Sequence, residues 1–86
     1  MKHYNLTAEQ KKLDIAGLLK LLEEKSDDRW KLGEAYTYVR SDHAGSRFRN
    51  ARKYEQAVER EIMRRLGLKT YPGREALVKA AKAALT

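Results

Sequence analysis

Five polar side chains in the second half of the chain recur at helical spacing and could bind phosphate groups. If residues 47–66 form a helix, these side chains project within about 40° of one direction. They are Arg49, Lys53, Gln56, Arg60 and Arg64, called here the basic stripe, and we expect Arg47 and Arg52 to flank it. The stripe extends over about 22 Å. Guanidinium groups donate paired hydrogen bonds to phosphate oxygens, so the spacing is typical of a surface that binds nucleic acid.

The charges of the basic stripe are poorly balanced within their own helix. Arg49, Lys53 and Arg60 have no acidic residue three or four positions away on either side. A solvated helix face usually alternates the two signs at these spacings. We therefore expect an external polyanion, DNA or RNA, as the partner. An acidic surface of a larger protein is the alternative partner, and a merely solvated face is the simplest explanation that needs no partner.

A second basic patch is expected on the last helix of the chain. Arg74, Lys79 and Lys82 would form it. The segment from residue 61 to 80 resembles a helix-turn-helix motif, with Gly67 opening the turn. That resemblance implies that the last helix contacts DNA. The sequence departs from the motif at Gly73, where a buried aliphatic residue is needed.

Chemistry of other kinds has little support in the sequence. Asp42 and His43 are adjacent near two serines, but adjacency along the chain does not orient an acid, a base and a nucleophile. The chain has two histidines and no cysteine, so a transition metal would need carboxylates from several helices. The spacing of the glycines fits neither of the glycine-rich motifs, Walker or Rossmann, that bind nucleotide phosphates. The sequence predicts a protein without catalytic residues, metal or cofactor, with a regulatory or accessory role.

The net charge and its distribution agree with an anionic partner. The chain has 19 Lys and Arg against 12 Asp and Glu, a formal charge of +7. Residues 1–46 have equal numbers of basic and acidic side chains, so the whole excess lies in residues 47–86. The absence of cysteine excludes a disulfide framework. No apolar run approaches the ~18 residues of a membrane span, and the first residues lack a signal peptide. These features predict a cytoplasmic protein that does not contact a membrane.

Four helices of a single all-α domain, residues 1–86, are expected to position these side chains. The predicted helices cover about residues 8–25, 27–40, 47–66 and 72–85, with a polar loop at 41–46. Thr7 and Ser26 are the expected N-caps of the first two helices, and Gly67 is the expected C-cap of the third.

The predicted core is small. Leu18, Leu22, Val58 and Ile62 are typical members of it, while Glu55 is an exception on the apolar face of the third helix. Trp30 lies off the apolar face of its helix, which favours a core contact with another helix over an exposed anchor for a partner. Because large aliphatic residues are few, a homodimer that buries the fourth helix would supply further buried surface.

Overall fold

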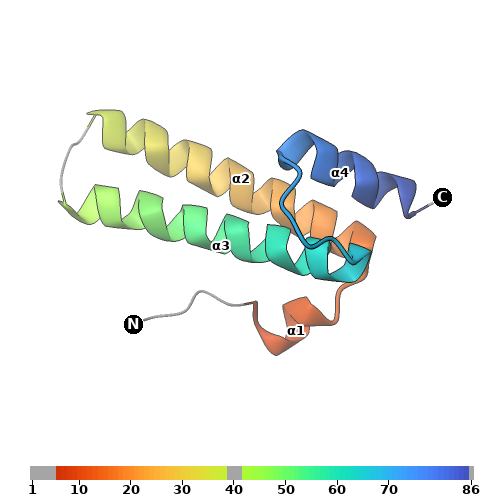
Figure 1. Cartoon of the computed structure of the whole chain (residues 1–86). Coiled ribbons are helices and arrows are strands. Elements are labelled where there is room, and N and C mark those ends of the chain that lie inside the picture. Colours follow the sequence, from red (N-terminus) through yellow and green to blue (C-terminus); the bar gives the residue numbers. More distant parts are fainter. Residues whose placement is uncertain (1–5, 39–41, 86) are drawn as a thin grey trace.

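Two long antiparallel helices form the frame of the molecule in the computed structural model (Figure 1). The structure describes residues 6–38 and 42–85, with the side chains of residues 42–44 left out. Its elements are α1 (Ala8–Lys11), α2 (Ile15–Tyr38), α3 (Asp42–Leu66) and α4 (Arg74–Ala83). The described residues contain helices and no strand, so the prediction of an all-α bundle is confirmed.

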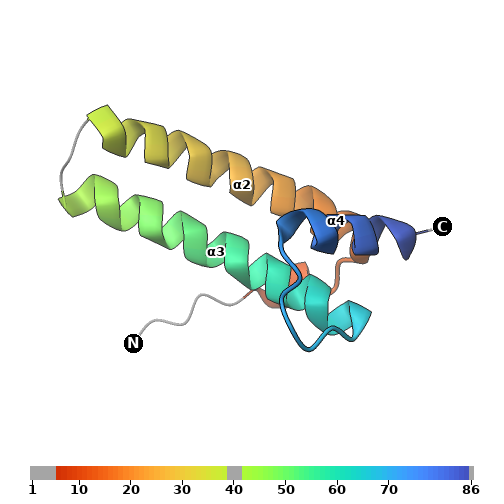
Figure 2. The same cartoon turned by 45° about the horizontal axis from the view of Figure 1, so that its top comes forward.

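The two short helices cover only one end of the α2–α3 hairpin (Figures 1 and 2). Both α1 and α4 lie near the start of α2 and the end of α3. The first residue of α4, Arg74, contacts Ser26 of α2 and Glu55 of α3. Beyond these contacts, residues 30–38 and 42–54 extend as a two-helix arm that neither short helix covers. The molecule is elongated in consequence, with extents of 43 × 25 × 22 Å.

The hydrophobic core lies at the covered end of the hairpin. Leu18 and Leu22 of α2 meet Val58 and Ile62 of α3, and Leu77 of α4 closes the cluster. These five side chains have at most 2% of their surface exposed. The apolar periodicity of the sequence correctly identified the four side chains of α2 and α3. The homodimer stays a prediction.

The arm is held together by two aromatic rings that pack on glycines of the opposite helix. A Cβ atom built at Gly33 would lie 2.9 Å from Cε2 of Phe48. One built at Gly45 would lie 3.1 Å from Cε2 of Tyr36. Each helix thus offers a position without a side chain to a ring of the other, and the two backbones approach closely.

The predicted break between the first two helices, at Ser26, is wrong. The Ser26 hydroxyl donates to the carbonyl oxygen of Leu22 at 2.8 Å, so α2 continues through this position without needing a cap. The break lies earlier in the chain. Thr7 caps α1 as expected, through a capping box with Gln10, but α1 has only four residues. Asp14 then accepts from the Gly17 amide at 2.8 Å at the start of α2.

Other boundaries also differ from the prediction. α3 begins at Asp42, so most of the predicted loop 41–46 is helical, while residues 39–41 lie outside the described part of the chain. α4 begins at Arg74 rather than at residue 72. The end of α3 is confirmed: Gly67 has φ +72°, and the Leu68 amide donates to the carbonyl of Met63 at 2.9 Å.

The last two helices do not form a helix-turn-helix. The connection between them covers residues 67–73, which is longer than the three or four residues of that motif. The connection crosses back over the bundle, and α4 then runs in broadly the same direction as α3 (Figures 1 and 2).

Candidate functional site

The basic stripe lies on the outer face of α3, turned away from the core. All five of its residues are exposed, while Val58 and Ile62 on the inner face of the same helix are fully buried. Arg52 is also exposed, on the flank of α3 nearer to α4. The helix spacing read from the sequence therefore places these side chains in solvent together.

One member of the stripe is neutralised by a neighbour. Arg64 Nη2 lies 2.5 Å from Oε1 of Glu61, and Arg64 Nε donates to Oε2 at 3.0 Å. Arg65 Nε contacts the same carboxylate at 3.1 Å. The hydrogen bonds from Arg64 lower the pKa of Glu61. Burial acts in the opposite direction, but the hydrogen bond from Arg65 also lowers the pKa, and the carboxylate stays ionised. Glu61 is therefore shared by Arg64 and Arg65, three and four residues later on α3.

The remaining cations of this surface form what we call the cationic face: Arg49, Arg52, Lys53 and Arg60. Within the residues that the structure describes, the three arginines have no acidic partner. Arg49 and Arg60 are 11 residues apart, about 16 Å along the helix. The three arginines are accessible donors for an external anion.

A cleft of about 680 Å³ opens beside the cationic face, between α2 and α3 and next to the start of α4. Arg52, Gln56 and Arg60 line its α3 side, so the cleft and the cationic face share one wall. Its other polar lining includes Arg29 of α2 and Arg74 of α4.

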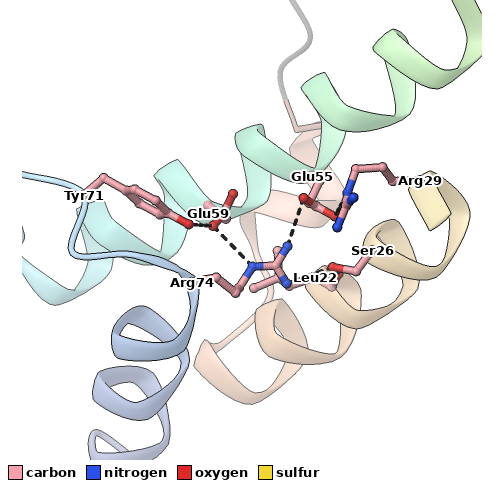
Figure 3. Close-up of polar contacts among 7 residues, drawn as sticks. All are labelled: Leu22, Ser26, Arg29, Glu55, Glu59, Tyr71 and Arg74. Atoms are coloured by element: carbon pink, nitrogen blue, oxygen red, sulfur yellow. Dashed lines mark hydrogen bonds and ion pairs between the residues drawn. The ribbon is translucent and has the colours of Figure 1, made fainter. Parts of the chain in front are cut away.

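Arg74 is the centre of a polar network in this cleft (Figure 3). Its Nη1 donates to Oγ of Ser26 at 2.8 Å, and its Nη2 lies 3.0 Å from Oε1 of Glu55. Its Nε donates to Oε2 of Glu59 at 3.3 Å, and the Tyr71 hydroxyl donates to the same oxygen at 2.6 Å. All three guanidinium nitrogens are used inside the molecule. Arg74 therefore fastens α4 and its preceding connection to the hairpin.

Glu55 connects this network to α2. Its second oxygen, Oε2, accepts from Arg29 Nε at 2.8 Å (Figure 3). Burial would raise the pKa of Glu55, but the hydrogen bond from Arg29 and the charge of Arg74 outweigh burial and lower it. Burial and the hydrogen bond to Glu59 raise the pKa of Tyr71, so its hydroxyl keeps its proton. No buried side-chain polar atom in the described residues lacks a hydrogen-bond partner.

The other residues predicted for the site lie apart from the cationic face. Arg47 lines a second cleft of about 550 Å³ on the opposite side of the hairpin, with Lys25, Lys31 and Tyr54. There Lys25 Nζ lies 5.4 Å from the centre of the Tyr54 ring.

Lys79 and Lys82 are exposed on α4, while Arg74 is half-buried in the network. The predicted second patch is therefore divided between a structural arginine and two surface lysines.

Sequence reasoning missed the network, although one signal pointed to it. Glu55 falls on the apolar face of α3, and a carboxylate in that position needs buried partners. Trp30 also differs from expectation, because 69% of its surface is exposed where a core contact was favoured. Trp30 lines a third cleft, of about 390 Å³, with Gly33, Tyr38 and Phe48.

Comparisons with known proteins add no functional information. No family model, curated protein or solved structure matches the chain. None of the helices in residues 6–38 and 42–85 is both long and apolar enough to cross a membrane. Among the side chains that the structure describes, no three His, Asp or Glu residues converge as a metal-ligand group would.

Proposed function

We propose that this chain binds nucleic acid through phosphate contacts made by the cationic face of α3, as a small accessory or regulatory protein of the cytoplasm that does not catalyse a reaction. One observation carries the proposal. Arg49, Arg52 and Arg60 are exposed on one helix and have no acidic partner among the described residues. Arginine suits this role because its planar group donates two parallel hydrogen bonds to phosphate oxygens.

The arrangement has an internal cost that a polyanion would relieve. Arg49 and Arg52 are three residues apart on one helix, a spacing at which like charges destabilise by a few tenths of a kcal/mol. By contrast, the cations in the network and beside Glu61 are each held by a carboxylate. The molecule therefore pairs its structural arginines and leaves those of the cationic face available.

The proposed contact is to the phosphate backbone of DNA or RNA. Phosphate contacts position a protein on nucleic acid and carry no direct sequence information. α4, which would read bases in a helix-turn-helix, is tied to the hairpin by Arg74 and lacks that motif's short turn. The proposal therefore assigns affinity to α3 and no base reading to α4.

A charge reversal on the cationic face tests the proposal. The double variant Arg49→Glu, Arg60→Glu should lower affinity for labelled DNA or RNA at low salt by at least about tenfold, because two charge-assisted contacts become repulsive. The control is Lys20→Glu, Lys31→Glu, which changes the charge equally on exposed positions of α2. It should bind within a few-fold of the unsubstituted protein. Circular dichroism checks that both variants fold.

Two outcomes would contradict the proposal. Equal losses in the two double variants would mean that net charge, and not the face of α3, determines binding. The absence of binding to any DNA or RNA, together with a nuclease-resistant protein recovered by pull-down and lost in the Arg49→Glu, Arg60→Glu variant, would identify an acidic protein surface as the partner.

A further inference from the structure

Three aromatic side chains gather on one side of the arm, where neither short helix covers them. Trp30 is 69% exposed and Tyr38 is 82% exposed, and both line one cleft with the half-buried ring of Phe48. Gly33 and Thr37 lie between Trp30 and Tyr38 in the sequence and also line this cleft. Small side chains at these positions leave the tryptophan ring accessible from solvent. We call this group the aromatic cleft.

The aromatic cleft adjoins the cleft beside the cationic face. Arg29 lines both. The antiparallel helices are also in a defined register, because Arg29 contacts Glu55 and Gly33 faces Phe48. Between these two contacts, the helix register brings Trp30 of α2 level with Arg52 of α3. The exposed indole of Trp30 and the exposed guanidinium of Arg52 therefore lie at the same position along the length of the hairpin.

The charge around the two clefts favours a polyanion with flat apolar groups. Arg52 and Arg60 are exposed without an acidic partner among the described residues, and Glu34 is the acidic residue that lines the aromatic cleft. Proteins that bind single strands combine a positively charged groove with aromatic rings on which bases stack. Bases of a duplex are already stacked on each other, so a ring at the edge of a groove reaches only unpaired bases.

We propose that the ligand of this surface is single-stranded nucleic acid, with an unpaired base stacked on Trp30 and neighbouring phosphates held by Arg52 and Arg60. This inference rests on the proposed function and specifies the strand state. The cations supply affinity for any nucleic acid, while Trp30 adds a contact that a continuous duplex does not make. The protein then prefers single strands at equal salt.

The single tryptophan of the chain makes the inference directly measurable. Titration with a short oligothymidylate should quench the fluorescence of Trp30, whereas a blunt duplex of equal length should bind more weakly and leave the fluorescence nearly unchanged. Trp30→Ala should lower single-strand affinity by about 5- to 150-fold, the range for losing one stacked base. The same variant should leave duplex affinity unchanged, and Trp30→Phe should retain part of the preference.

An abasic strand is the matched control on the ligand side. The unsubstituted protein should lose affinity for it by about the same factor as Trp30→Ala loses for the intact strand. If Trp30→Ala binds single strands as tightly as the unsubstituted protein and no quenching occurs, stacking is absent and the inference fails. The proposed function still stands in that case if the Arg49→Glu, Arg60→Glu variant loses affinity. Equal quenching by duplex and single strand would also overturn the inference, and failure to bind any nucleic acid would overturn both.

Discussion

Glu55 shows how a charged residue is accommodated beside the core. Each of its oxygens is bound by a different arginine, Arg29 from α2 and Arg74 from α4. A buried carboxylate without such partners would lose several kcal/mol of solvation. Glu55 lies on the apolar face of α3 because this face meets α2 and α4, and the arginines that bind its carboxylate come from these two helices. The same residue joins all three larger elements of the fold.

The ionised form of Glu55 should stabilise the fold in a pH-dependent way. Its pKa in the folded protein is lowered, so its contribution is present above the ordinary value of 4.5 and is lost as the pH falls through the folded-state pKa. Glu61, whose pKa is also lowered, contributes with the same sign. Glu55→Gln should reduce the free energy of unfolding at pH 7 by about 1–3 kcal/mol, because it leaves two arginines without their carboxylate.

Urea unfolding at pH 7 and at several values below 4.5 measures this effect. The difference between the unsubstituted protein and Glu55→Gln should shrink as the pH falls. Glu75→Gln, at an exposed position of α4, is the control and should change stability little at any pH. A constant difference between Glu55→Gln and the unsubstituted protein across this range would show that the charge of Glu55 is not what stabilises the network.

Among the elements, the arm depends on the fit between rings and glycines. Alanine at Gly33 would gain about 1 kcal/mol of helix propensity, but its Cβ would lie 2.9 Å from the ring of Phe48. We expect Gly33→Ala to stabilise the protein by about 1 kcal/mol when Phe48 is already alanine, and to lose most or all of that gain when Phe48 is present. A double-mutant cycle by urea unfolding measures the coupling.

Tyr36→Ala provides the control background for this cycle. Tyr36 packs on Gly45, and the three atoms nearest to a Cβ at Gly33 all belong to Phe48, so Tyr36→Ala should not alter the effect of Gly33→Ala. If Gly33→Ala has the same effect with and without Phe48, the ring does not restrict this position.

The helices and the core could be predicted from sequence because both depend on local patterns. Apolar spacing identified Leu18, Val58 and Ile62, and the cap at Thr7 and the end at Gly67 followed from side-chain chemistry. The break at Ser26 was predicted wrongly because a serine hydroxyl can cap a helix or bond back to the carbonyl four residues before it. Nothing within a few residues of Ser26 distinguishes the two states.

The composition of the site was harder to predict because it depends on contacts distant in sequence. From the sequence alone, Arg74 and Arg49 have the same interpretation, as basic residues on the exposed faces of helices. In the fold, Arg74 meets carboxylates 15 and 19 positions earlier, while Arg49 has no acidic partner among the described residues. Trp30 is exposed because the arm extends beyond α4, and the position of α4 is set by the same long-range contacts.

At the scale of the whole molecule, the hydrophobic core and the aromatic cleft occupy different ends. α1, α4 and the fully buried side chains lie at one end of the hairpin, and the aromatic cleft lies on the arm at the other. The cationic face extends along α3 from the arm towards the covered end. Substitutions on the arm surface can therefore change binding without removing core contacts. A loss of binding in such a variant then reflects the surface and not unfolding of the protein.

This separation allows charge and stacking to be distinguished by salt. With the three arginines of the cationic face each neutralising one phosphate, the logarithm of single-strand affinity should fall with the logarithm of salt concentration with a slope of about −2.1, since each neutralised phosphate contributes about −0.7. Arg49→Glu, Arg60→Glu should reduce the magnitude of the slope by at least about half. Trp30→Ala should weaken binding at every salt concentration and leave the slope unchanged, because stacking releases no counterion. Fluorescence anisotropy with a labelled strand measures both quantities, and a changed slope in Trp30→Ala would mean that Trp30 acts by positioning the arginines and not by stacking.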